Sequence, residues 1–257
     1  MSAYEIALIL AFVGALAGFV DSIVGGGGLI SVPAVLLTGL PPATALGSNK
    51  LGSVFGAFTA MTNYARHGAV SWDVVGRLVP LAFCGSLGGA ALVMWLSPTY
   101  VKPIVIALLI AVLLFTIFKC DWGEVNTFHK GGYKQQVILV TMAFGIGLYD
   151  GFIGPGTGTF LTIAFLLLGF DFLQAAGNTK VLNFITNITA LGLFLTMGQI
   201  DILYGLSMAV GQVIGAFLGS RFALTGGTRL VRLLLIVVTA GMLIKLVYDY
   251  TLSGALG

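Results

Sequence analysis

The sequence predicts an all-α polytopic membrane protein, made of two inverted repeats of about five segments each, with a short discontinuous or re-entrant helix pair at a glycine-rich break in each repeat. Three observations predict this fold: an apolar composition, a motif that occurs twice, and apolar segments too short to cross a bilayer. Of the 257 residues, 58% are hydrophobic and 8% are charged, and the mean hydropathy is +1.06. A soluble domain carries about 25% charged residues, so this composition indicates an integral membrane protein.

Ten apolar segments divide equally between the two halves. Helices are expected rather than barrel strands, because long apolar runs such as residues 103–118 do not alternate in polarity. The first repeat, residues 1–119, contains segments 4–24, 29–37, 44–65, 74–96 and 103–119. After a polar linker at 120–134, the second repeat, residues 135–257, contains segments 136–153, 159–168, 172–197, 202–222 and 230–250. The second segment of each repeat would be a helix of only ~15 Å, which cannot cross a ~30 Å hydrocarbon layer alone.

A glycine-rich break, with an acidic residue before it and a lysine after it, occurs once in each repeat. Matching positions are Asp21 and Asp150, Gly25 and Gly154, Gly27 and Gly156, and, after one extra residue in the second copy, Gly47 and Gly177, and Lys50 and Lys180. Irregular backbone at membrane depth is tolerated only where it is buried in protein or lines a wet cavity. Matching breaks in two halves therefore point to a transporter binding site made from discontinuous helices.

Basic residues in the loops predict that the two repeats are inverted. The loop after the third segment carries Arg66, His67 and Arg77 in the first repeat, and its counterpart at 198–201 carries no basic residue. The next loop reverses this, with Lys102 in the first copy and Arg221, Arg229 and Arg232 in the second. Because cytoplasmic loops are enriched in Lys and Arg, corresponding loops are expected on opposite faces, with the linker cytoplasmic and both termini outside.

Lysines inside an apolar chain begin as functional candidates, because a buried charge is costly. Lys50 and Lys180 open the third segment of each repeat, and an anion is the natural ligand for two ammonium groups beside the N-termini of short helices. Glycines would let the backbone approach that ligand without a Cβ in the way. The candidate substrate-binding residues are Lys50, Lys180, Asn49, Ser53, Asn178, Thr179, Asn183, Gly26, Gly27, Gly28, Gly156, Thr157 and Gly158. The alternative is that both lysines snorkel to the interface.

Asp21 and Asp150 have two interpretations that the sequence leaves open. A buried carboxylate can take up and release a proton as a site alternates, which would couple transport to protons. Alternatively, each aspartate has a structural role and pairs with a lysine or accepts hydrogen bonds from the amides that a helix break leaves free.

Other functional classes lack their signatures. No HExxH, GxSxG or CxxC motif occurs, and the glycine run lacks the ending of a P-loop, so no enzyme, metal site or cofactor is expected. Scattered basic residues and a net charge of +3 give no nucleic-acid footprint. Cys84 and Cys120 are expected to pack, and the first apolar segment is expected to remain as a helix. The expected partners are a small anion and the lipid bilayer; whether transport is coupled to protons and whether the chain forms a homodimer stay open.

The motifs DSIVGGGGLISVPA, ATALGSNKLGS, YDGFIGPGTGTF and AAGNTKVLN resemble the TauE/SafE family of anion exporters, especially its YfcA-like branch. The resemblance covers nearly the whole chain, and it implies an inner-membrane permease that moves sulfite, sulfonates or related sulfur-containing anions, usually outward. The family's glycine-rich motifs fall on residues 25–28 and 154–158, and its Asn-Lys element falls on Asn49 and Lys50. The second copy departs from the pattern at Thr179, Pro155 and Thr157, so two ligand-binding halves would be unequal.

The function predicted from the residues and the resemblance together is secondary transport of a small sulfur-containing anion by alternating access. Inverted halves supply a site that is reached from each side in turn. A passive anion channel with the same lysine and helix-end site is the alternative, and measured flux would separate them. The sequence does not define the substrate, the direction, the coupling ion or the oligomeric state.

Overall fold

The structure, a computed structural model, describes residues 2–95, 128 and 132–225. Every regular element in this part of the chain is a helix. The helices are α1 (Ala3–Val24), α2 (Gly28–Leu36), α3 (Pro42–Arg66), α4 (Trp72–Trp95), α6 (Tyr133–Phe152), α7 (Thr157–Leu167), α8 (Phe172–Thr196) and a further helix, Ile202–Thr225. The segments predicted at 103–119 and 230–250, and most of the linker, lie outside the described residues.

The predicted all-helical, polytopic class is confirmed for the described residues. Four helices are long and apolar enough to cross a membrane: Ala3–Val24, Trp72–Trp95, Phe172–Thr196 and Ile202–Thr225. Local chemistry explains several helix ends. Gly25, with φ 79°, ends α1 in the left-handed conformation that glycine adopts without strain, and the Asp171 carboxylate caps α8 by accepting the Gln174 amide.

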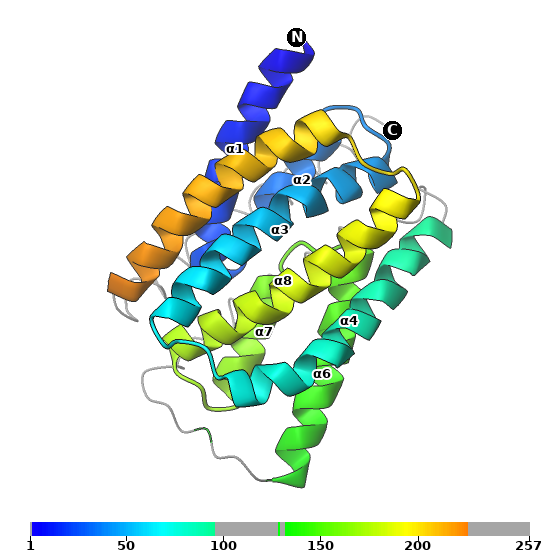
Figure 1. The fold of residues 1–257 in the computed structure, drawn as a ribbon. Coiled ribbons are helices and arrows are strands. Elements are labelled where there is room, and N and C mark those ends of the chain that lie inside the picture. Colours follow the sequence, from blue (N-terminus) through cyan, green and yellow to red (C-terminus); the bar gives the residue numbers. More distant parts are fainter. Residues whose placement is uncertain (1, 96–127, 129–131, 226–257) are drawn as a thin grey trace, which may run out of the picture.

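The two halves interleave, as Figure 1 shows: α4 runs beside α6, and the blue helix α1 runs beside the orange helix Ile202–Thr225. Both pairs approach closely through glycine. A Cβ on Gly89 would overlap the Leu148 carbonyl oxygen, and a Cβ on Gly215 would overlap the Ala15 carbonyl oxygen. Small residues at such positions let apolar helices pack backbone to backbone where no hydrophobic effect drives their association.

Adjacent glycines on α4 provide a matched test of this packing. We expect Gly89→Ala to destabilise the protein by about 1–3 kcal/mol, because the added methyl overpacks the contact with α6. A Cβ on the neighbouring Gly88 would meet nothing within 4 Å, so Gly88→Ala should be neutral or slightly stabilising through its better helix propensity. Thermal unfolding of the two detergent-purified variants checks this; equal melting temperatures would show that close approach at Gly89 is unimportant.

Helices α3 and α8 pack against one another at the centre of the fold (Figure 1). Each also contacts a residue of the opposite half. Ser48 Oγ on α3 accepts a hydrogen bond of 2.8 Å from the Asp201 amide, which precedes the helix Ile202–Thr225. Asn178, at the corresponding position on α8, accepts a hydrogen bond of 2.8 Å from the Ser71 amide, which precedes α4. Corresponding residues of the two halves thus make corresponding contacts, each with the opposite half.

Candidate anion site

The two glycine-rich breaks touch one another in the interior of the fold. Gly25 O accepts a hydrogen bond of 3.2 Å from the Thr159 amide, and Thr159 Oγ1 donates to Val24 O at 3.0 Å. A Cβ on Gly25 would overlap the backbone of Gly158, and the φ of 79° disfavours a side chain as well. Glycine is therefore required at residue 25 for both space and backbone conformation.

The two breaks differ in local conformation. In the second, Gly154, Pro155, Gly156 and Thr157 form a type II turn, which is closed by a hydrogen bond of 3.1 Å from the Thr157 amide to Gly154 O. Proline is common at the second position of this turn, and the third position requires a positive φ, which Gly156 supplies with φ 84° and ψ −4°. In the first break, Gly27 has right-handed helical dihedrals, and its amide donates to Asp21 Oδ1 at 3.2 Å.

Two crossed ion pairs join the halves at this level. Lys50 Nζ lies 2.9 Å from Asp150 Oδ1, with both side chains buried. Lys180 Nζ lies 2.6 Å from Asp21 Oδ2, and the Asp21 side chain is 22% exposed. Each lysine therefore pairs with the aspartate of the other half. The two ammonium groups do not snorkel to an interface, and the interpretation in which each aspartate pairs with a lysine agrees with these contacts.

A cavity of about 20 Å³ lies where the breaks and the ion pairs meet. Its lining comes from both halves and consists of Asp21, Gly25, Gly28, Asn49, Lys50, Ser53, Asp150, Gly154, Gly158, Asn183 and Asn187. This volume suffices for about one water molecule. A polyatomic anion is larger than one water molecule, so the cavity is too small to hold one in this arrangement of its side chains.

Six of the predicted substrate-binding residues line this cavity, together with both predicted carboxylates. They are Lys50, Asn49, Ser53, Asn183, Gly28 and Gly158, with Asp21 and Asp150. The lysine and the two small polar residues come from α3, whereas Asn183 comes from α8. Residues that are far apart in the sequence thus converge on one volume.

The other predicted residues do not line it. Lys180 reaches Asp21 instead, Asn178 binds the Ser71 amide, and Thr179 Oγ1 accepts a hydrogen bond of 3.2 Å from Thr162 Oγ1. Thr157 Oγ1 donates to Gly154 O at 2.7 Å. Gly26, Gly27 and Gly156 lie within the breaks, where they shape the backbone rather than face the cavity.

Three lining residues were missing from the set expected to bind substrate: Gly25, Gly154 and Asn187. Asn187 had a signal in the sequence, because it lies four residues after Asn183 and therefore on the same face of α8. Gly25 precedes the expected ligand-binding stretch of the first break, and Gly154 precedes that of the second. The contact between the two breaks brings both glycines to the cavity.

Backbone amides at the start of the short helices remain available to a ligand. The amides of Gly28 and Gly158 donate to no acceptor within the described part of the chain, and both residues line the cavity. Free amides and the positive end of the helix dipole make such N-termini favourable for anions. Together with Lys50, they give the cavity donors from α2, α3 and α7.

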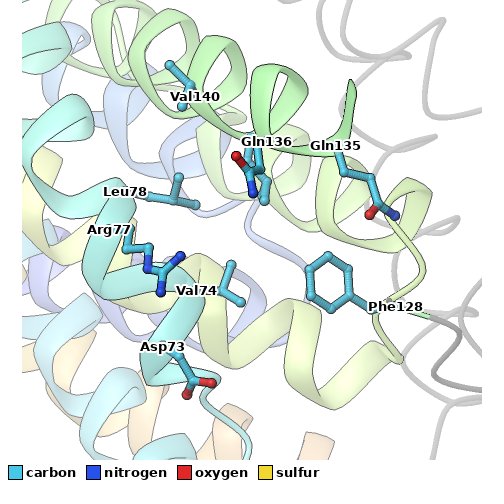
Figure 2. A pocket seen from close by; sticks show the side chains of 9 residues that line it. Asp73, Val74, Arg77, Leu78, Phe128, Gln135, Gln136 and Val140 are labelled. Carbon is cyan, nitrogen blue, oxygen red and sulfur yellow. The ribbon is translucent and has the colours of Figure 1, made fainter. Parts of the chain in front are cut away.

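A larger cavity, of about 210 Å³, lies elsewhere, between the first turns of α4 and α6 and beside Phe128 (Figure 2). Its polar residues are Asp73, Arg77, Gln135 and Gln136, and the rest of its lining is apolar. It contains no residue of either glycine break and neither paired lysine. The smaller cavity therefore remains the candidate anion site.

Several apolar spanning helices around a buried, charged and glycine-lined site are typical of a membrane transporter, and comparison with known proteins defines the family. The chain belongs to the family described as sulfite exporter TauE/SafE, whose sequence profile matches residues 10–246. No solved structure matches it.

Curated relatives share most of their length with this chain. It is 39% identical over 237 residues to the probable membrane transporter protein ORF9 of Sinorhizobium, covering 92% of this chain and 90% of the relative. It is 37% identical over 246 residues to a probable membrane transporter protein of Haemophilus influenzae, covering 95% and 96%. It is also 37% identical over 242 residues to the probable membrane transporter protein YfcA of Escherichia coli, covering 94% and 89%. The predicted family and its YfcA-like branch are thus confirmed.

Proposed function

We propose that this protein is a secondary transporter that exports a small sulfur-containing anion, such as sulfite or an organosulfonate, by alternating access. The observation that carries the proposal is two crossed ion pairs at the contact between the helix breaks: the buried pair of Lys50 with Asp150, and the partly buried pair of Lys180 with Asp21. A sulfur-containing substrate and outward direction are supported by the family, which is described as a sulfite exporter family.

Anion selectivity follows from the donors that the cavity offers. Lys50 provides a cation whose side chain is 3% exposed, and Gly28 and Gly158 provide amides at helix N-termini. In the closed arrangement the Asp150 carboxylate satisfies Lys50. A substrate anion would take the place of this carboxylate as the partner of the ammonium group, so the ion pair and the bound anion are alternatives.

Alternating access requires that the site be reached from each side of the membrane in turn. We propose that the halves are inverted repeats in a bacterial-type inner membrane. The linker and the Arg66 loop would lie on the cytoplasmic side, and both termini would lie outside. The reciprocal contacts of Ser48 and Asn178 support this arrangement, because two halves related by a two-fold axis exchange equivalent contacts. Rocking of one half against the other would then open the site to either side.

A panel of anions in counterflow tests the proposal. Purified protein in liposomes preloaded with sulfite, thiosulfate, sulfoacetate, sulfolactate, taurine or sulfate should accelerate uptake of the same radiolabelled solute, and the rate should saturate. At least one sulfur-containing anion is expected to give counterflow that protein-free liposomes lack. A current that follows the electrochemical gradient, without counterflow, would support the alternative of a passive anion channel. No flux of any anion in the panel would contradict both.

A further inference from the structure

We propose that Asp150, and not its counterpart Asp21, is the residue that binds the coupling proton of this transporter. The proposal rests on the function proposed above and goes one step further, because it gives the two equivalent carboxylates different roles. Asp21 then has a structural role, and the proton taken up by Asp150 allows an anion to replace the carboxylate beside Lys50.

The two carboxylates differ in the number of hydrogen bonds that they accept. Asp21 uses both oxygens: Oδ2 accepts from Lys180 Nζ at 2.6 Å, and Oδ1 accepts from the Gly27 amide at 3.2 Å. Asp150 uses one: Oδ1 accepts from Lys50 Nζ at 2.9 Å, while the buried Oδ2 has no partner within the described residues. A buried charged oxygen without a donor is destabilising, and protonation lowers that cost because it removes the charge and turns the group into a donor.

The sequence explains this difference. Gly27 and Gly156 occupy matching positions in the two breaks, yet only the Gly27 amide reaches its aspartate. In the second break, Pro155 suits the second position of the turn, and Gly156, at φ 84°, supplies the left-handed third position that makes the turn type II. The turn uses the Thr157 amide to close on Gly154 O, and Asp150 is left without the backbone donor that Asp21 has.

A second unpartnered group lies at the same cavity. Asn49 Oδ1 is buried and accepts no hydrogen bond in the part of the chain that is described, and Asn49 and Asp150 both line the cavity of about 20 Å³. Each of these two lining residues thus keeps one buried acceptor without a donor among the described residues. A protonated carboxyl group at Asp150 would supply an O–H donor where both groups are now acceptors.

Among the charged groups around Asp150, the other carboxylate already has a cationic partner, so one proton at Asp150 is enough to neutralise the site. From α3 it faces Lys50, and across the cavity it faces Asp21 on α1, which Lys180 on α8 neutralises. On α4, which packs along α6, the ionisable residues are Asp73 and Arg77 in the first two turns and Cys84, which is exposed. The interior of α7 contributes no ionisable side chain, and the neighbouring Tyr149 hydroxyl donates to Pro155 O.

Charge balance then links one proton to each monovalent anion, so proton and anion move in the same direction and an outward gradient of the anion drives export. Without substrate, two ammonium groups and two carboxylates sum to zero. A bound monoanion would leave the buried site with one negative charge, which is costly at low dielectric. A proton from the aqueous side forms an O–H bond on Asp150, so the carboxyl group becomes neutral and its ion pair with Lys50 ends. The anion then pairs with Lys50 in its place, and the net charge of the site stays zero.

Infrared spectroscopy tests the proton site without any substrate. In pH-difference spectra of the purified protein in lipid, we expect a carboxylic acid C=O band that is absent in Asp150→Asn and retained in Asp21→Asn. If Asp150→Asn folds poorly because Lys50 loses its counterion, Asp150→Glu serves instead, since it should keep the band but shift the pH at which it rises. A band lost in Asp21→Asn and kept in Asp150→Asn, or no band that depends on Asp150, would overturn the proposal.

Transport in liposomes separates this proposal from the proposed function. Under a pH gradient, wild-type protein should accumulate radiolabelled sulfite, or whichever anion of the panel gives counterflow, above its equilibrium level. Asp150→Asn should still exchange the anion, at a lower rate. Its gradient-driven accumulation of the anion should be at least about tenfold lower than that of wild-type protein. Asp21→Asn should still accumulate the anion in response to the gradient. Wild-type accumulation by Asp150→Asn would refute the proton role. An Asp150-dependent band without flux of any anion would contradict the proposed function alone.

Discussion

Lys50→Ala should reduce anion counterflow to the level of protein-free liposomes. Lys50 supplies the ammonium group of the cavity, and its side chain is 3% exposed and paired with Asp150 at 2.9 Å. Lys50→Arg should retain part of the flux, because it keeps the charge, but a planar guanidinium places its donors differently. Counterflow measured with each variant at equal protein in the liposomes checks both expectations.

Loss of folding must be separated from loss of the ligand in this experiment. Removing one partner of a buried ion pair costs about 3–5 kcal/mol, because the Asp150 carboxylate would be left without its cation. The double variant Lys50→Ala, Asp150→Asn removes both charges and should recover much of the folded yield by size-exclusion chromatography, yet transport no anion. Wild-type counterflow by either alanine variant would exclude Lys50 from the anion site.

Gly154→Ala should lower the initial rate of anion transport by at least about tenfold, through steric intrusion into the same ion pair. A Cβ on Gly154 would lie 2.9 Å from Lys50 Nζ and 3.1 Å from Asp150 Oδ1. The φ of 91° adds strain of roughly 1–2 kcal/mol for a residue with a Cβ. Radiolabelled uptake into liposomes, normalised to folded protein, measures the effect.

Gly145→Ala is the matched control for Gly154→Ala. Gly145 lies in α6, the helix that carries Asp150, and a Cβ there would meet nothing within 4 Å. This variant should transport at the wild-type rate and unfold at the same or a slightly higher temperature. If the two alanine variants transport equally well, the tight backbone beside the ion pair has no role in the transport cycle.

Local signals in the sequence predicted the helices well. Apart from Trp95 and Thr225, which border residues outside the described part of the chain, the ends of the described helices lie within three residues of the predicted ends. Composition and length identify membrane helices because an apolar slab imposes a fixed span, and glycine marks the breaks because only it adopts the φ of Gly25 and Gly156 without strain.

The partners of the charged residues could not be predicted from the sequence. Asp21 and Lys50 belong to one copy of the motif, but the structure pairs each with the other copy. Nothing in either copy encodes this exchange, which depends on how α3 and α8 cross between the halves. Asn178 shows the same limit for a single residue. A helix turns by ~100° per residue, so Asn178 binds the Ser71 amide, whereas Lys180, two residues later, binds Asp21.

The difference between the two breaks was visible in the sequence, but its consequence was not. Pro155 and Thr157 interrupt the second glycine run, and this departure predicted unequal halves. The turn conformation specified by Pro155 and Gly156 explains the inequality, because it leaves Asp150 Oδ2 without a donor while Asp21 keeps the Gly27 amide. These hydrogen bonds are set by the three-dimensional backbone conformation, which the sequence alone does not show.

An experimental structure with a heavy-atom substrate analogue tests the central claim, that one anion binds between the two helix breaks. In crystals of the protein soaked with selenite, the selenium analogue of sulfite, anomalous scattering locates the anion directly. We expect one selenium peak within hydrogen-bonding reach of Lys50 Nζ and the amides of Gly28 and Gly158, with the Asp150 carboxyl group displaced from Lys50. A peak only in the cavity beside Arg77 and Gln136, or an intact Lys50–Asp150 pair beside a bound anion, would contradict the account.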